Sequence, residues 1–182
     1  MCLNVWAHTY SDAEARSTWA RLQRQPLSEK IFRETCDLIQ DVGQTNLPLA
    51  YEWLAQYVAK IKKTGNRRWI HILLINWGKA KESLNHYDEA EPIFTQARQN
   101  AQPEPLLYCQ ALTYTAQLYF DWDKPDSLAR YLALGEQVAR KANDRETLAL
   151  LRVFRGASRS RADPIEAVCA DFNDAFRLAC NM

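Results

Sequence analysis

Glycine is scarce in this chain, and a long apolar run is missing. Only five glycines occur in 182 residues, which favours helices over the turn-rich connections of β structure. The longest apolar stretch, Trp69 to Trp77, is interrupted by His71 and Asn76 and has about half the length of a membrane-spanning helix. Residues 1–10 lack the basic start and apolar core of a signal peptide. We therefore expect no membrane insertion within this chain.

Strong net charge and paired cysteines are missing as well. The formal net charge is +1, so we expect no global attraction to nucleic acid or to an anionic membrane. The odd number of cysteines and the lack of CxxC spacing fit neither a disulfide framework nor a zinc site. The cysteines are Cys2, Cys36, Cys109, Cys169 and Cys180. Unpaired, reduced thiols are typical of a reducing compartment, so we expect a cytoplasmic location. If the sequence is a fragment excised from a longer protein, that protein could instead be exported.

Catalytic motifs are not found either. The chain has no P-loop, no GxGxxG and no HExxH. Its histidines are far apart in sequence: His8, His71 and His86. Asp121, Asp123 and Asp126 resemble the start of a calcium loop, but Asp126 stands where such a loop needs glycine and Leu132 where it needs glutamate. We interpret that segment as a helix cap and expect no enzyme, no catalytic residue, no cofactor and no metal site.

What the chain does contain is a helical pattern that recurs about every 39 residues. Equivalent positions, at spacings of 40, 38 and 40, are Ala50, Ala90, Leu128 and Val168. Four residues after each come large apolar side chains: Leu54, Phe94, Leu132 and Phe172. Twelve residues before each come Leu38, Gly78, Ala116 and Gly156, of which three are small. Such a period, with small residues where helices must approach closely, is typical of stacked helical hairpins.

The spacing of apolar residues predicts nine helices. They are expected near residues 11–24, 28–42, 47–63, 67–84, 88–100, 105–121, 124–141, 144–158 and 164–180. The last eight pair into hairpins near 28–63, 67–100, 105–141 and 144–180, within a single domain over 1–182 that has one extra N-terminal helix. Three helix starts are interpreted as capping boxes: Ser11-x-x-Glu14, Asp88-x-x-Glu91 and Asn143-x-x-Glu146. Gly65 is expected to end a helix in the left-handed conformation.

These residues resemble the tetratricopeptide repeat family. The best match has Leu74, Trp77 and Gly78, then Tyr87, Ala90, Phe94 and Ala97, and finally Pro103. The segment from Leu112 to Gly135 matches less closely. The period is longer than the family's repeat of about 34 residues, and in this respect the chain resembles bacterial regulatory and sensor members with longer helices. The resemblance implies an all-α fold, a right-handed α-α superhelix whose concave groove is lined by the first helix of each hairpin.

The groove positions of that family fall on four helices of this chain. The resemblance places the partner-binding groove at Ile72, Ile75, Lys79, Gln110, Thr113, Gln117 and Phe120. Further positions are Phe32, Thr35 and Ile39 at one end, Glu82 in the middle, and Leu150, Val153 and Ser160 at the other end. Ile72, Ile75 and Phe120 fit equally well as core residues buried by neighbouring helices.

The sequence thus indicates a protein–protein interaction module that binds a peptide or protein segment, as the sensory or regulatory part of a larger bacterial signalling protein. Two alternatives stay open. A nucleic-acid-associated repeat would use the basic patch of Lys60, Lys62, Lys63, Arg67 and Arg68, although the low net charge favours a solvated edge. A self-association scaffold would form a homodimer through exposed apolar end helices. A second cluster is also interpreted as a solvated edge: Arg152, Arg155, Arg159 and Arg161.

Overall fold

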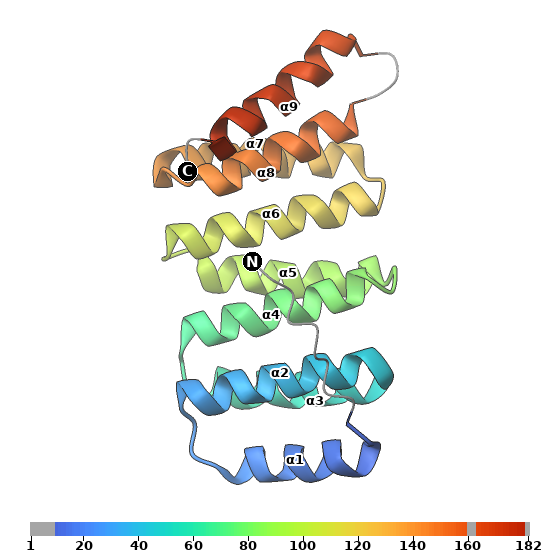
Figure 1. Cartoon of the computed structure of the whole chain (residues 1–182). Helices are drawn as coiled ribbons and strands as arrows, with labels where there is room; N and C mark the ends of the chain where they lie inside the picture. The colour runs from blue at the N-terminus through green and yellow to red at the C-terminus, as the bar shows by residue number, and fades with distance from the viewer. Residues whose placement is uncertain (1–9, 160–162, 181–182) are drawn as a thin grey trace. The chain divides into compact units, whose positions relative to one another are not determined.

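The computed structural model of the chain describes residues 10–159 and 163–180, which form nine α-helices and no strand (Figure 1). The helices are α1 (Asp12–Arg24), α2 (Glu29–Thr45), α3 (Leu47–Lys62), α4 (Arg67–Glu82), α5 (Tyr87–Ala101), α6 (Pro105–Asp121), α7 (Pro125–Ala142), α8 (Arg145–Ser158) and α9 (Ile165–Cys180). The prediction of an all-α fold with nine helices is confirmed for this part of the chain. The superhelical arrangement stays a prediction. None of the described helices is long and apolar enough to cross a membrane.

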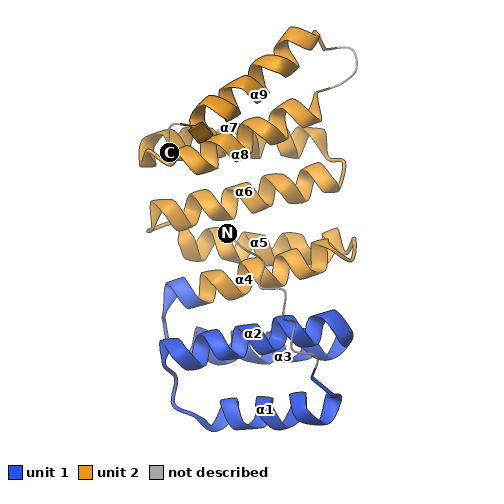
Figure 2. Cartoon of the chain, in the orientation of Figure 1, with its two compact units in different colours: residues 1–69 blue, residues 70–182 orange. Residues whose placement is uncertain are grey.

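The chain divides into two compact units, residues 1–69 and residues 70–182, with the boundary inside α4 (Figure 2). The single domain that the sequence predicts over 1–182 stays a prediction. We refer to the two parts as unit 1 and unit 2.

Aromatic side chains form much of the core of unit 1. The indole rings of Trp19 and Trp53 stack with their centroids 4.7 Å apart, which ties α1 to α3. The ring of Phe32 of α2 stacks on the ring of Trp69 at the start of α4, with the centroids 4.9 Å apart. The Trp69 indole N–H donates to the Glu29 carboxylate over 2.9 Å, so the polar edge of this ring has a partner. The predicted capping box of Ser11 and Glu14 begins α1.

Close approach of helices characterises unit 2. A Cβ added to Gly78 would lie 2.6 Å from the Phe94 ring, and one added to Gly156 would lie 3.2 Å from the Phe172 ring. Both pairs join the first and second helices of a hairpin, sixteen residues apart in sequence. The small residues of the repeated pattern therefore lie where the sequence predicts, because any side chain there would collide with the large residue of the following helix.

Left-handed asparagine and aspartate residues shape three turns of unit 2. Asn85, Asp123 and Asn143 have φ angles of 60°, 53° and 53°, a conformation that these short polar residues tolerate better than others. They supply what Gly65, with φ 68°, supplies in unit 1 as predicted. The scarcity of glycine is thus compatible with tight turns between helices.

Two of the three predicted capping boxes are wrong. Asn143 ends α7, and the next residue, Asp144, caps α8 by accepting from the Thr147 N–H over 3.0 Å. The helix α5 begins one residue before Asp88 and has no side-chain cap. In both cases, a left-handed residue closes the preceding helix so tightly that the next helix begins at a neighbouring position.

Candidate partner-binding cleft

A cleft of ≈ 680 Å³ lies in unit 2 along α4, α6 and α8. These are the first helices of three hairpins, which are the elements that the resemblance assigns to a groove. The lining residues are Lys79 from α4; Leu106, Leu107, Gln110, Thr113, Tyr114 and Gln117 from α6; and Asp144, Glu146, Thr147, Leu150 and Phe154 from the start and body of α8.

Residues of α6 that are spaced at helical intervals form the floor of the cleft. Leu106, Gln110, Thr113 and Gln117 follow one another at intervals of four, three and four residues, which places their side chains on one face of the helix. The opposite face of α6 is buried, with Leu112 and Ala116 wholly inaccessible. Gln110 is exposed and Gln117 is half-buried in the cleft, whereas Thr113 is only 6% exposed and its hydroxyl donates to the Cys109 carbonyl.

A cation lies at one wall of the cleft. The Lys79 ammonium is 5.0 Å from the centroid of the Tyr114 ring, within the range of a cation–π interaction. Tyr114 in turn stacks on Phe94, with the centroids 6.4 Å apart. Because the ring is fixed by this packing, the charge of Lys79 is held near the cleft although its side chain is exposed.

The Gln110 amide is oriented by a buried histidine. His71 of α4 has no exposed surface, and its Nε2 lies 2.8 Å from the Gln110 Oε1. Which group donates in this contact depends on the tautomer of the ring. Burial lowers the pKa of His71, against a smaller opposing effect of the Gln110 bond. The contact holds the Gln110 side chain in place, and because Gln110 is exposed, the rest of its amide group is available to a ligand.

The other wall combines acidic and apolar groups. Asp144 is committed to capping α8, whereas Glu146 is exposed. Leu106 and Leu150 are 63% and 44% exposed, which is unusual for leucine and leaves apolar surface for a partner. Phe154 packs against Phe120, with the ring centroids 5.8 Å apart, so the apolar wall rests on the core beneath it.

Four of the seven predicted groove residues lie together in this cleft: Lys79, Gln110, Thr113 and Gln117. The other three do not line it. Ile75 is only 4% exposed, Ile72 is half-buried, and Phe120 is half-buried against the core cluster that contains Leu132 and Leu151. These three residues have the environment of core residues, which is the alternative that the sequence left open.

The further groove positions are divided in the same way. Leu150 lines the cleft, and Val153 is exposed outside it. Ser160 lies outside the described residues. Glu82, Phe32, Thr35 and Ile39 are buried.

The lining residues of the cleft that sequence analysis missed are Leu106, Leu107, Tyr114, Asp144, Glu146, Thr147 and Phe154. Leu106 and Leu107 could have been found, because they precede Gln110 by four and three residues on the same helical face.

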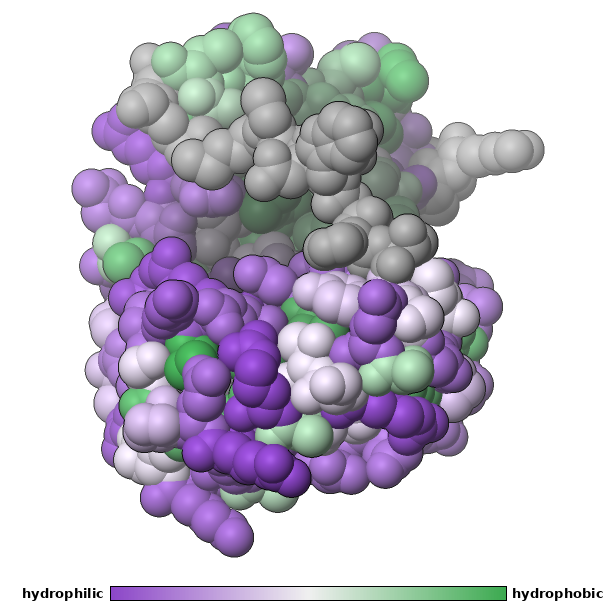
Figure 3. Space-filling view, turned by 60° about the horizontal axis from the view of Figure 1, so that its bottom comes forward, coloured by the Kyte–Doolittle hydropathy of each residue, from purple (hydrophilic) through white to green (hydrophobic). Residues whose placement is uncertain are grey.

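The predicted basic patch surrounds the turn between α3 and α4. Lys60 is half-buried, and its ammonium donates to the Gln23 carbonyl and side-chain oxygens over 3.1 and 3.2 Å. It therefore serves a contact within unit 1. The other four cations are exposed: Lys62, Lys63, Arg67 and Arg68. Figure 3 is turned so that the α1 end comes forward, and the surface there is mostly hydrophilic.

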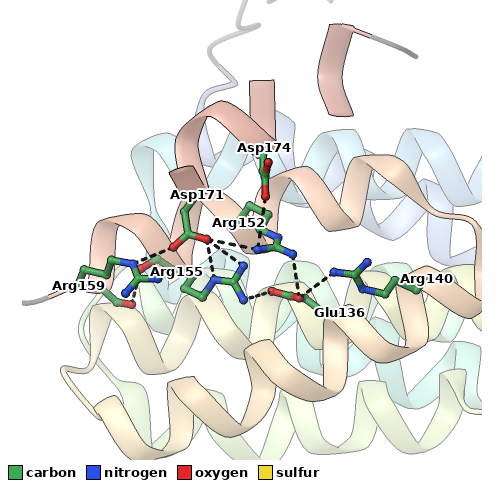
Figure 4. A network of polar contacts seen from close by, with 8 residues as sticks. Glu136, Arg140, Arg152, Arg155, Arg159, Asp171 and Asp174 are labelled. Atoms are coloured by element: carbon green, nitrogen blue, oxygen red, sulfur yellow. Dashed lines mark hydrogen bonds and ion pairs between the residues drawn. The ribbon is translucent and has the colours of Figure 1, made fainter. Parts of the chain in front are cut away.

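The second cluster of arginines is not a solvated edge. Arg152 and Arg155 of α8, and Arg159 directly after its end, pair with the carboxylates of Glu136 and Asp171, as Figure 4 shows. Arg155 spans both acids, 2.7 Å from Glu136 and 2.9 Å from Asp171. The Asp171 side chain is only 5% exposed, and the arginine side chains are 18–29% exposed. The interpretation as a solvated edge is therefore wrong for these three residues. Arg161 lies outside the described residues.

This ion-pair network joins α7, α8 and α9. Its acids come from α7 and α9, and its arginines come mainly from α8. At the periphery, Arg140 lies 3.5 Å from Glu136, and Asp174 lies 3.8 Å from Arg152. Each buried carboxylate has several cationic donors, which offsets the cost of removing it from water. The network fixes the last three helices and leaves the partner-binding cleft to other residues.

Thiols and candidate metal ligands give no second site in the described part of the chain. Burial and, to a smaller extent, the neighbouring Asp144 carboxylate raise the pKa of Cys109 to about 11, so this thiol stays protonated and unreactive. No group of three or more His, Cys, Asp or Glu residues is placed to hold a metal ion between residues 10 and 159 or 163 and 180.

Comparison of the chain with protein-family models, curated proteins and solved structures gave no match.

Proposed function

We propose that this chain is a tetratricopeptide-like interaction module that binds a polypeptide segment in the cleft along α4, α6 and α8. The observation that carries the proposal is the combination of exposed leucines with oriented polar groups in one cleft of ≈ 680 Å³. Mostly apolar concave sites with a few convergent polar groups are the usual form of a binding site. The repeated helical pattern supports the same function, since helical arrays use such surfaces to bind other proteins.

The cleft favours a segment of defined chemistry. Leu106 and Leu150 offer apolar contacts, and the exposed Gln110 amide, held by His71, offers a hydrogen-bonding group to the backbone of a ligand. Lys79 offers a positive charge at the α4 wall. The proposed ligand is an extended or helical segment with apolar side chains and an acidic group placed to meet Lys79. The setting that the resemblance implies is the sensory or regulatory part of a larger bacterial signalling protein.

Selection of displayed random peptides on the immobilised full chain would test this proposal. The enriched peptides would then be titrated against the wild type, Lys79→Glu and Leu150→Ala. We expect each substitution to weaken binding by about tenfold or more, because it removes a charge partner or an apolar anchor. Acidic and apolar residues should be enriched among the selected peptides.

Matched controls separate the cleft from the rest of the surface. Val153→Ala alters a side chain of the same helix that is 40% exposed and does not line the cleft. Lys63→Glu reverses an exposed charge in unit 1. Both should leave the affinity within about twofold of the wild type. A selection without enriched peptides, or peptides that bind all variants equally, would contradict the proposal.

A further inference from the structure

One side of α9, beside its contact with α8, carries exposed apolar side chains, and the Phe172 ring also lies next to Gly156 of α8. Ile165 and Phe176 are 68% and 69% exposed, and Phe172 is 42% exposed. The helix packs against α8 and has no other extensive helix contact among the described residues (Figure 1). Large apolar side chains exposed side by side on one helix usually mark an interaction surface. In the described part of the chain, the other exposed large hydrophobic residues are Leu106 on α6 and Leu150 and Val153 on α8, so α9 carries three of the six.

The apolar stripe of α9 is nearly symmetric about its middle. Phe172 lies seven residues after Ile165 and seven residues before Ala179, and seven residues are about two helical turns. Cys169 and Phe176 lie three residues before and four residues after Phe172, and both are exposed. An antiparallel copy of the same helix would therefore place apolar residues opposite apolar residues along the whole stripe.

The charges beside the stripe have the complementarity that such a pairing needs. Glu166 lies six residues before Phe172, and Arg177 lies five residues after it. Eleven residues separate the two, which is about three helical turns, so both lie on the same flank. In a two-fold antiparallel pair that flank meets its own copy, and Glu166 faces Arg177 of the second copy twice. The guanidinium has five N–H donors and can serve a second copy besides any contact in its own chain.

We propose that α9 is a self-association surface and that its occupant is the α9 helix of a second copy of this chain, in antiparallel two-fold arrangement. The symmetric apolar stripe and the self-complementary charges both point to this occupant. Binding of an unrelated helix would not need a symmetric stripe or self-complementary charges on α9. One helix from each copy makes a small interface, so the dimer is expected to be weak and to depend on protein concentration.

Sedimentation velocity of the full chain over a wide concentration range, with reductant because Cys169 and Cys180 are exposed, would test the proposal. The wild type should show a reversible monomer–dimer equilibrium, and Phe176→Glu should weaken it by about a hundredfold. Glu166→Arg and Arg177→Glu should each weaken it by about tenfold, because like charges then face each other twice. A 1:1 mixture of these two variants should regain dimers, and so should the double variant Glu166→Arg/Arg177→Glu.

The rescue in the mixture is the decisive observation, because a substitution that merely damages the fold cannot be repaired by a second chain. Leu106→Glu is the matched control: Leu106 is 63% exposed but lies in the cleft, so this variant should dimerise like the wild type. A chain that stays monomeric at all concentrations, or a mixture without heterodimers, would overturn the proposal. Peptide binding in the cleft would be unaffected by either result.

Discussion

Glu82 is a buried acid whose ionisation should oppose folding. Its side chain lies at the end of α4 with 6% of the residue exposed. The pKa of this carboxyl is raised to about 7, mainly by burial and also by the Asp121 carboxylate, while Lys79 partly offsets the effect. One of the Glu82 carboxyl oxygens has no hydrogen-bond partner. We therefore predict that Glu82→Gln, which keeps the shape and removes the charge, stabilises the protein at pH 8.

The size and sign of this effect follow from the two pKa values. Below pH 4.5, the ordinary value, Glu82 is protonated in both the folded and the unfolded state, and the substitution should change little. Between pH 4.5 and 7 the unfolded state loses its proton first, so the wild type loses stability as the pH rises. The full difference corresponds to at most about 3 kcal/mol, because each pKa unit is worth about 1.4 kcal/mol. Since a buried amide also needs hydrogen-bond partners, we expect about 2 kcal/mol at pH 8.

Urea denaturation followed by far-UV circular dichroism at pH 5, 6, 7 and 8 would measure this difference. The free energies of unfolding of the two proteins should differ by less than about 1 kcal/mol at pH 5, where the unfolded state has begun to lose its proton, and the difference should grow toward pH 8. Glu89→Gln is the control, because Glu89 is exposed and pairs with Lys81 over 2.6 Å, which lowers its pKa. Its curve should run parallel to that of the wild type over this range. Parallel curves for Glu82→Gln as well would refute the reasoning.

Two further substitutions test the packing and the ion-pair network. Gly78→Ala should lower the free energy of unfolding by about 1–3 kcal/mol, because its Cβ would lie 2.6 Å from the buried Phe94 ring. Gly43→Ala, whose Cβ would meet only Ala50 at 3.7 Å, should stabilise α2 by about 0.5–1 kcal/mol. If urea titrations gave Gly78→Ala a higher free energy of unfolding than Gly43→Ala, this account of the packing would be contradicted. Asp171→Asn should cost about 3 kcal/mol, since it leaves buried arginines without their shared carboxylate. Asp174→Asn, at the exposed edge of the network, should cost less than about 1 kcal/mol by the same measurement, and equal losses would argue against a role of burial.

The helices could be predicted from sequence because local signals agree with the apolar pattern. Each predicted helix matches an observed one, and the largest difference is at α2, which continues to Thr45 beyond the predicted end at residue 42. The turns were harder to predict. The segment Asn143-Asp144 contains two residues that can cap a helix, and the sequence alone does not show which one adopts the left-handed conformation.

The candidate cleft could be predicted only in part, for a physical reason that differs between helices. On α6, the polar residues Gln110 and Gln117 mark the accessible side. On α4, Ile72 and Ile75 belong to an apolar run in which the sequence does not separate a groove residue from a core residue, and Ile75 is buried. The ion-pair network was missed because its acids, Glu136 and Asp171, lie on other helices than the arginines, and only the tertiary fold brings them together.

The two proposed surfaces are compatible with each other because they use different helices of unit 2. No residue of α9 lines the cleft along α4, α6 and α8, and the stripe of Ile165, Phe172 and Phe176 lies outside it. Two-fold pairing through α9 would therefore leave both clefts open and create a bivalent module. A partner that presents two copies of the recognised segment would then bind with higher avidity than a single cleft provides. A variant such as Phe176→Glu should lose this gain while its affinity for a single peptide stays unchanged, which separates the contribution of pairing from that of recognition.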